Sequence, residues 1–136
     1  MMLDTSKQMM LIEKALEARE HAYAPFSGFF VGAALLSADG EIFLGANIEN
    51  SSYGGTICAE RSAFAAAIST GKREFVAIAI VGGKGGEKPL EPCAPCGICR
   101  QFMAEFCSAD FPVILYDGKS PVCSTLGELL PYAFKL

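Results

Sequence analysis

Apolar and polar positions follow a helical period in some segments of this chain and an extended period in others. Residues 4–23 place apolar side chains at helical spacing between charged ones, which predicts a helix that ends before Pro25. Residues 29–37 and 41–46 are predicted to be strands. The intervening Ala38-Asp39-Gly40 is typical of a β-hairpin turn, so the two strands should be antiparallel neighbours.

The second half of the chain continues the alternation of helix and strand. A polar loop over 47–56 precedes an alanine-rich helix over 57–70. Residues 75–81 form a near-continuous apolar run, typical of a strand buried on both faces, and a glycine- and proline-rich loop over 82–95 follows. The remaining predicted elements are a helix over 96–107, a strand over 112–116, a short strand at Val122-Cys123, and a short helix with a Thr125/Glu128 capping box that stops at Pro131.

This order of elements predicts one domain over residues 1–136 with an α/β (α+β-like) layered sandwich. Its centre should be a mixed five-stranded sheet flanked by helices. A chain of 136 residues buries about two-thirds of its surface on folding, which suffices for a core without disulfides.

Composition and charge narrow the classes of function. Hydrophobic residues make up 51% of the chain and charged residues 19%, which excludes a disordered or fibrous protein. The net charge is −4 without a basic stripe, so a nucleic-acid polymer is not an expected partner. Apolar runs are too short to span a bilayer and no signal segment is visible, so we expect no membrane association and a cytoplasmic location. With so few charges, part of the surface is expected to be buried between subunits.

Six cysteines include a dense cluster, Cys93, Cys96 and Cys99, at intervals of three. In a reducing compartment such a cluster favours metal binding over disulfides. Cys96 and Cys99 lie on one predicted helical turn and can hold one ion together. A third ligand, Cys58, is available at the start of the other helix. Three protein ligands with an open fourth position are typical of catalytic zinc.

The other cysteines have simpler interpretations. Cys93 lies between Pro92 and Pro95, in backbone that cannot be helical, and is predicted to be a loop thiol. Cys107 and Cys123 are predicted to be small hydrophobic core residues.

Two charged residues follow Cys58 closely. Glu60 is too near Cys58 in the sequence to be a natural fourth ligand, yet near enough to reach a zinc-bound water, which is the position of a proton shuttle. Three thiolates leave the zinc site negatively charged, which opposes deprotonation of that water. The positive ends of the two helices and the guanidinium of Arg61 are expected to offset this charge. Without the cysteines, Arg61 would be an ordinary exposed helix residue.

Three segments occur in order: Asn-Ile-Glu-Asn at 47–50, Thr-Ile-Cys-Ala-Glu-Arg at 56–61, and Ala-Pro-Cys-Gly-Ile-Cys-Arg-Gln at 94–101. Together they resemble the small zinc-dependent cytidine deaminases, and the resemblance covers nearly the whole chain. It implies a cytidine deaminase-like fold with one Zn²⁺ per subunit. It also implies hydrolytic deamination of cytidine and 2′-deoxycytidine to uridine and 2′-deoxyuridine by a zinc-activated water, as in pyrimidine salvage.

The resemblance also implies a set of site residues and a homotetramer whose sites are completed across interfaces. The zinc ligands would be Cys58, Cys96 and Cys99, with Glu60 as the proton shuttle. The implied substrate contacts are Phe29 packing on the pyrimidine ring, the backbone of Ala59 at the base, Asn47 and Glu49 at the ribose hydroxyls, and Tyr53 and Phe134 reaching a neighbouring subunit's site.

Alternatives remain at this stage. A deaminase of a modified cytosine nucleoside antibiotic would share the three-cysteine pattern, although Asn47 and Glu49 favour a free ribose. A structural module would close the zinc site with Cys93 as a fourth ligand and leave Glu60 without a role. A redox or iron–sulfur centre fits less well, because the cysteines match those motifs only in part. Phe29 as a core residue, Asn47 and Glu49 as loop caps, and Phe134 as a frayed end are the ordinary alternatives.

Overall fold

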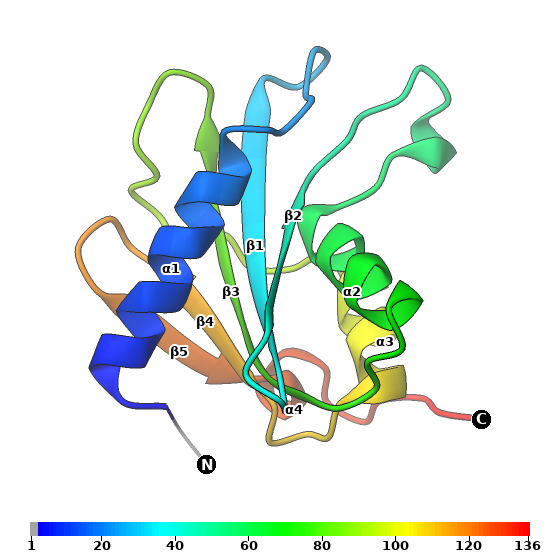
Figure 1. The fold of residues 1–136 in the computed structure, drawn as a ribbon. Helices are drawn as coiled ribbons and strands as arrows, with labels where there is room; N and C mark the ends of the chain where they lie inside the picture. Colours follow the sequence, from blue (N-terminus) through cyan, green and yellow to red (C-terminus); the bar gives the residue numbers. More distant parts are fainter. Residues whose placement is uncertain (1–2) are drawn as a thin grey trace.

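The structure, a computed structural model, describes residues 3–136 and contains the expected alternation of helices and strands (Figure 1). The helices are α1 (Thr5–Arg19), α2 (Ala59–Ser69), α3 (Gly97–Phe106) and α4 (Leu126–Leu129), with a short 3-10 helix, η1 (Tyr53–Gly55). The strands are β1 (Phe29–Ser37), β2 (Ile42–Ala46), β3 (Phe75–Lys84), β4 (Pro112–Tyr116) and β5 (Pro121–Thr125).

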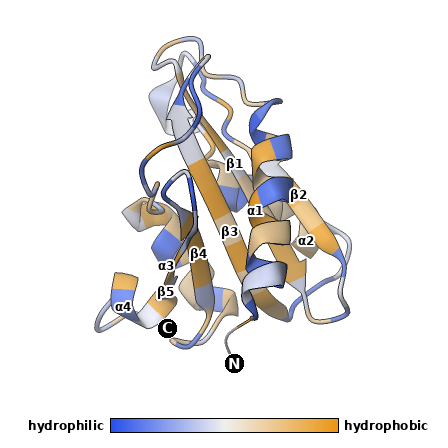
Figure 2. Ribbon diagram, turned by 90° about the vertical axis from the view of Figure 1, so that its left-hand side faces the viewer, coloured by the Kyte–Doolittle hydropathy of each residue, from blue (hydrophilic) through white to orange (hydrophobic). Residues whose placement is uncertain are grey.

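The strands form one sheet in the order β2-β1-β3-β4-β5, with β3 and β4 parallel and the other neighbours antiparallel. This confirms the predicted mixed five-stranded sheet. Helix α1 covers one face, and α2 and α3 cover the other (Figure 1). Side chains of β3 alternate between these layers: Ala77 and Ala79 cluster with α1, whereas Ile78 and Ile80 cluster with α2 and α3. Figure 2 shows the resulting hydrophobic middle of β3 within the sheet.

Two glycines let the helices lie directly on the strands. A Cβ atom at Gly32 would be 2.0 Å from the carbonyl oxygen of Ala15 in α1. On the opposite face, a Cβ atom at Gly45 would be 2.4 Å from both Ala59 O and Ala63 N in α2. Since these are backbone atoms, no side-chain rotation could relieve the contact. Gly45 therefore sets how closely α2 approaches the sheet.

Strand β3 is longer than predicted, because it continues through Gly82 to Lys84. Residues 82–84 pair antiparallel with the first residues of β1, Phe29 to Val31. The prediction of a loop that begins at Gly82 is therefore wrong. Ladder hydrogen bonds with β1 outweigh the low strand propensity of glycine.

Helix α1 is shorter than predicted and ends at Arg19. The Arg19 guanidinium donates to carbonyl oxygens of both β1 and β3. Tyr23, which matched the helical period, instead donates its N–H to Asn47 O at 2.9 Å and forms an isolated bridge with Ile48. Pairing with a segment distant in sequence therefore overrides the local pattern.

The C-terminal elements agree closely with the pattern. Thr125 and Glu128 form the predicted capping box: Thr125 N donates to Glu128 Oε1 at 2.9 Å and Glu128 N donates to Thr125 Oγ1 at 3.2 Å. Within residues 3–136, no helix combines the length and apolar character needed to cross a membrane.

Candidate metal centre

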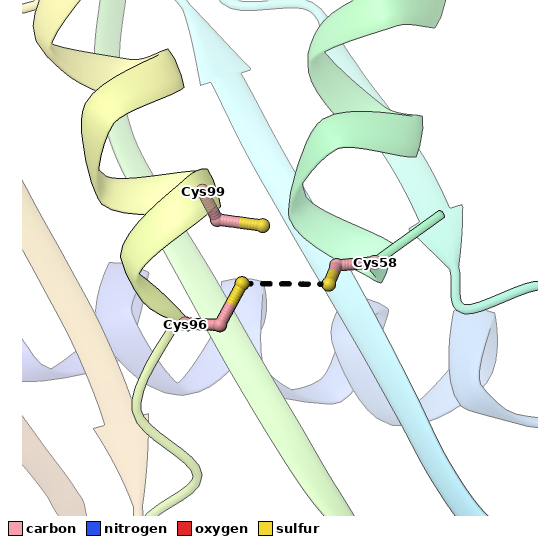
Figure 3. A group of neighbouring side chains, drawn as sticks. All are labelled: Cys58, Cys96 and Cys99. Atoms are coloured by element: carbon pink, nitrogen blue, oxygen red, sulfur yellow. Dashed lines mark hydrogen bonds between the residues drawn. The ribbon is translucent and has the colours of Figure 1, made fainter. Parts of the chain in front are cut away.

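Three cysteine thiols meet where helices α2 and α3 begin (Figure 3). Cys58 immediately precedes α2, Cys96 immediately precedes α3, and Cys99 lies in the first turn of α3. Their Sγ atoms all lie within 4.8 Å of one another, and those of Cys58 and Cys96 are 3.6 Å apart. Within residues 3–136, this is the one group of three or more His, Cys, Asp or Glu side chains spaced to hold an ion.

The three thiols suit a tetrahedral zinc ion. A Zn–S distance of about 2.3 Å separates two thiolates of a tetrahedral site by about 3.8 Å, close to the observed Cys58–Cys96 separation of 3.6 Å. Cys99 is buried and Cys96 is exposed, so solvent reaches the group from the Cys96 side. Cys93 does not belong to the group, so residues 3–136 form no closed four-cysteine site.

The backbone directs both helix-start cysteines toward the group. Cys58 and Cys96 are extended N-cap residues, and neither side chain caps its own helix. The segment before α3 is held by Arg100, whose guanidinium donates to Pro95 O and Leu129 O, each at 2.7 Å. The positive ends of two helices therefore meet at the thiols and place partial positive charge beside them.

Glu60, the second residue of α2, is buried, with 4% of its surface exposed. Burial raises the pKa of its carboxyl to about 7, and the charge of Cys58 acts in the same direction, whereas Arg61 acts against it. The same helix start thus carries both a candidate ligand and a buried carboxyl group.

Arg61 lies against the thiol group, with its Nη2 donating to Cys58 Sγ at 3.7 Å. The Cys99 thiol and then the Arg61 guanidinium lower the pKa of the Cys58 thiol to about 5, against the effect of burial. Arg61 Nε is buried without a hydrogen-bond partner among the described residues. Arg61 therefore brings positive charge to a site of three thiols.

The Phe29 ring and the Cys93 thiol share the space over Gly82 in β3. A Cβ atom at Gly82 would lie 2.7 Å from Cys93 Sγ and 3.1 Å from Phe29 Cε2. Burial and the nearby charges of Glu60 and Cys58 raise the pKa of the Cys93 thiol to about 11. Phe29 keeps 40% of its surface exposed, so part of its ring is available to a ligand.

Asn47 and Glu49 both contact the protein backbone. The Asn47 side-chain amide bonds to the backbone of β1. The Glu49 carboxylate accepts hydrogen bonds from the N–H groups of Phe26 and Ser27, in the turn before β1. These contacts agree with the loop-capping interpretation, while the second amide hydrogen of Asn47 leaves capacity for a ligand. Glu49 also lines a surface hollow of about 230 Å³, together with Phe26, Ser27, Tyr53 and Thr56.

The remaining predicted site residues differ in their exposure. Tyr53 and Phe134 are 80% and 66% exposed, so the structure does not bring them into the core. Gln101 Nε2 donates to Phe134 O at 2.8 Å and holds the C-terminal segment against α3. Ala59 is buried as the first residue of α2, where its N–H has no intrahelical acceptor.

Two residues that the sequence pattern did not single out also shape the surroundings. Ser27 Oγ donates to the Glu49 carboxylate and accepts from Phe29 N at 3.0 Å. A serine two residues before a strand is a signal that could have identified this turn. Gly82 offers no comparable signal, because its neighbours Cys93 and Phe29 are distant in sequence.

Serine substitutions should identify the ligands. Replacing Cys58, Cys96 or Cys99 singly with serine is expected to abolish stoichiometric zinc binding, because only two thiols would remain. Cys93→Ser is the matched control and should keep about one zinc per chain. Zinc would be measured by atomic spectrometry on desalted protein, and folding by circular dichroism. Loss of zinc from the Cys93 variant alone would reject this ligand set.

A layered α/β sandwich with thiols at two adjacent helix starts and a buried glutamate beside them defines the class of zinc-dependent hydrolytic deaminases. The chain matches the cytidine and deoxycytidylate deaminase zinc-binding region over residues 5–115. It belongs to this family.

Relatives and solved structures agree with this assignment. The chain is 52% identical over 128 residues to a cytidine deaminase of Halalkalibacterium halodurans, covering 93% of each chain. It is 50% identical to that of Sporosarcina psychrophila, covering 91% of this chain and 88% of the relative. The crystal structure of cytidine deaminase from Burkholderia pseudomallei superposes with a TM-score of 0.83 at 48% identity, covering 93% of this chain and 98% of that one.

Proposed function

We propose that this chain is a cytidine deaminase, which hydrolyses cytidine and 2′-deoxycytidine to uridine and 2′-deoxyuridine with release of ammonia. The observation that carries this proposal is the convergence of three thiols beside the buried Glu60 in a member of the deaminase family. Residues 1–136 act as one catalytic domain with one zinc ion. Thiol ligands need a reducing compartment, which favours the cytoplasm.

The residues divide into those that hold the ion and one that moves protons. Cys58, Cys96 and Cys99 hold zinc, which when bound supplies a Lewis acid that activates water. The Glu60 carboxylate accepts a proton from that water and delivers it to N3 of the pyrimidine ring. It would then move the proton of the oxygen newly bound to C4 to the exocyclic nitrogen, so that the C4–N bond breaks, ammonia leaves and C4 keeps the oxygen as a carbonyl. Arg61 keeps the Cys58 thiolate stable by its positive charge.

The substrate is held by side chains around this centre. The exposed part of the Phe29 ring packs on the pyrimidine, and the backbone of Ala59 contacts the base. Asn47 and Glu49 hold the ribose hydroxyls with the hydrogen-bonding capacity that their backbone contacts leave. The net charge of −4, without a basic stripe, favours a small nucleoside over a nucleic-acid polymer as the substrate.

The working unit in this proposal is a homotetramer. Exposed Tyr53 and Phe134 would complete the site of a neighbouring subunit. The outer face of α3 supports burial between subunits, because it carries an apolar hollow of about 730 Å³ lined in part by Ile98, Phe102 and Phe106. Light scattering coupled to size-exclusion chromatography would give the subunit number directly.

Ultraviolet absorbance of cytidine incubated with zinc-loaded protein tests the function. We expect steady conversion of cytidine and 2′-deoxycytidine, with one ammonia released for each uridine or 2′-deoxyuridine formed. Chelator-treated protein should be inactive and recover when zinc is returned. Absence of conversion by folded, zinc-loaded protein would overturn the proposal. Conversion of a modified cytosine nucleoside alone would instead support the antibiotic-nucleoside alternative.

A further inference from the structure

Both backbone hydrogen-bonding groups of Phe29 are held by side chains. Its N–H donates to Ser27 Oγ at 3.0 Å, and its carbonyl oxygen accepts from Asn47 Nδ2 at 2.9 Å. Asn47 Oδ1 also accepts from Val31 N at 2.9 Å, so the amide bridges the residues on either side of Phe30. The start of β1 is therefore held by specific side-chain contacts in addition to its pairing with β3.

The serine is itself oriented by Glu49. Ser27 Oγ donates its hydrogen to Glu49 Oε2, while Glu49 Oε1 accepts from the N–H groups of Phe26 and Ser27 at 2.9 and 3.1 Å. A hydroxyl has one hydrogen, so its commitment to the carboxylate leaves an oxygen lone pair for Phe29 N–H. The hydrogen bond from Ser27 lowers the pKa of Glu49, which keeps the carboxylate ionised as an acceptor.

The neighbouring backbone leaves little freedom to this turn. Gly28 has a φ of +67°, and its N–H donates to Ala24 O at 3.0 Å. Gly85 N, beyond β3, donates to Gly28 O at 2.8 Å. On the side-chain side, the Phe29 ring lies over Gly82. The ring is thus carried by a turn in which Ser27 Oγ bonds both the Phe29 N–H and the Glu49 carboxylate.

We propose that Ser27 is a positioning residue that links the Phe29 backbone, and through it the ring, to Glu49, while Asn47 holds the carbonyl oxygen of the same residue. The inference rests on the proposed function, because it takes Phe29 as the base contact and Asn47 and Glu49 as the sugar contacts. The same two side chains would then both hold the sugar and set the ring, so that placement of the sugar and of the base is coupled through the Phe29 backbone.

Kinetics of Ser27 variants in the full-length zinc enzyme test this role. Ser27→Ala is expected to raise KM for cytidine about tenfold with kcat changed less than about twofold, because the thiols and Glu60 are untouched. Ser27→Thr keeps the hydroxyl at an exposed position and should restore most of the loss. In a Phe29→Ala background, Ser27→Ala should change KM less than about twofold, since no ring remains to be placed.

A matched control and a second readout separate positioning from general stability. Ser37 also donates to a carboxylate, Asp39, but in the β1–β2 hairpin, so Ser37→Ala should leave KM unchanged even if it destabilises the fold. Hydrogen exchange of the Phe29 amide, followed by NMR, should accelerate in Ser27→Ala and not in Ser37→Ala. Equal effects of Ser27→Ala with and without Phe29, or unchanged amide exchange, would overturn the proposal. A wild-type chain inactive on cytidine would defeat the proposed function instead, and amide exchange would still decide the Ser27–Phe29 contact.

Discussion

Glu60→Gln is expected to lower kcat for cytidine by about 10³-fold while zinc stays at about one ion per subunit. Glutamine has nearly the shape of glutamate but cannot accept a proton from water or deliver one to the ring. Glu60 does not belong to the group of side chains that could hold the ion, so its replacement leaves the three cysteine ligands in place. The loss should therefore fall on the chemical step.

The measurement combines initial rates of cytidine conversion with zinc analysis of the same samples. Glu13→Gln provides a matched control, because Glu13 is an exposed helix carboxylate on α1, on the opposite face of the sheet. Its kcat should remain within about twofold of the wild-type value. Activity that persists in the Glu60 variant would remove Glu60 from proton transfer. Loss of zinc together with activity would assign Glu60 a structural role at the metal instead.

Gly45→Ala is expected to be the most disruptive single methyl addition near the site, lowering the free energy of unfolding by about 3 kcal/mol or more. The added Cβ would lie 2.4 Å from Ala59 O and Ala63 N. Both are backbone atoms, so the whole start of α2 must move away from β2. That start carries Cys58 and Glu60, and zinc binding should weaken with the fold.

Urea unfolding and zinc content would be measured on the same variants. Gly54→Ala is the matched control, because an added Cβ would meet no atom within 4 Å among residues 3–136 beyond its two chain neighbours, and its φ is not positive. It should change the free energy of unfolding by less than about 1 kcal/mol. Gly32→Ala makes the equivalent clash with α1 and should destabilise without a separate effect on the metal site. Gly45→Ala as stable as Gly54→Ala would mean that α2 can shift freely on the sheet.

The local elements of this fold follow well from the sequence. Apolar segments and the hairpin turn between the first two of them predicted the strands, and the Thr125/Glu128 pair predicted the capping box that the structure contains. The Cys96 and Cys99 spacing predicted two thiols on one helical turn, because residues three apart share a helix face. These features depend on contacts within a few residues of chain, which a sequence pattern contains.

Other features required the tertiary structure. The extension of β3 through Gly82 depends on pairing with β1, and Tyr23 leaves its helical pattern because it pairs with Asn47 and Ile48. Cys93 lies outside the thiol group, as the flanking prolines predicted, but its contact with Gly82 of β3 is visible only in the tertiary structure.

The sequence by itself determined the elements, the mixed sheet and the residue types of a zinc deaminase. Only the tertiary structure decided which atoms of those residues meet. Glu49 contacts Ser27, and Asn47 contacts Phe29, across gaps of 22 and 18 residues. Such contacts come from packing strands and loops against one another, and the free energy that selects them is shared among the whole core. The hydrophobic periodicity of a segment does not indicate which distant residues it will contact.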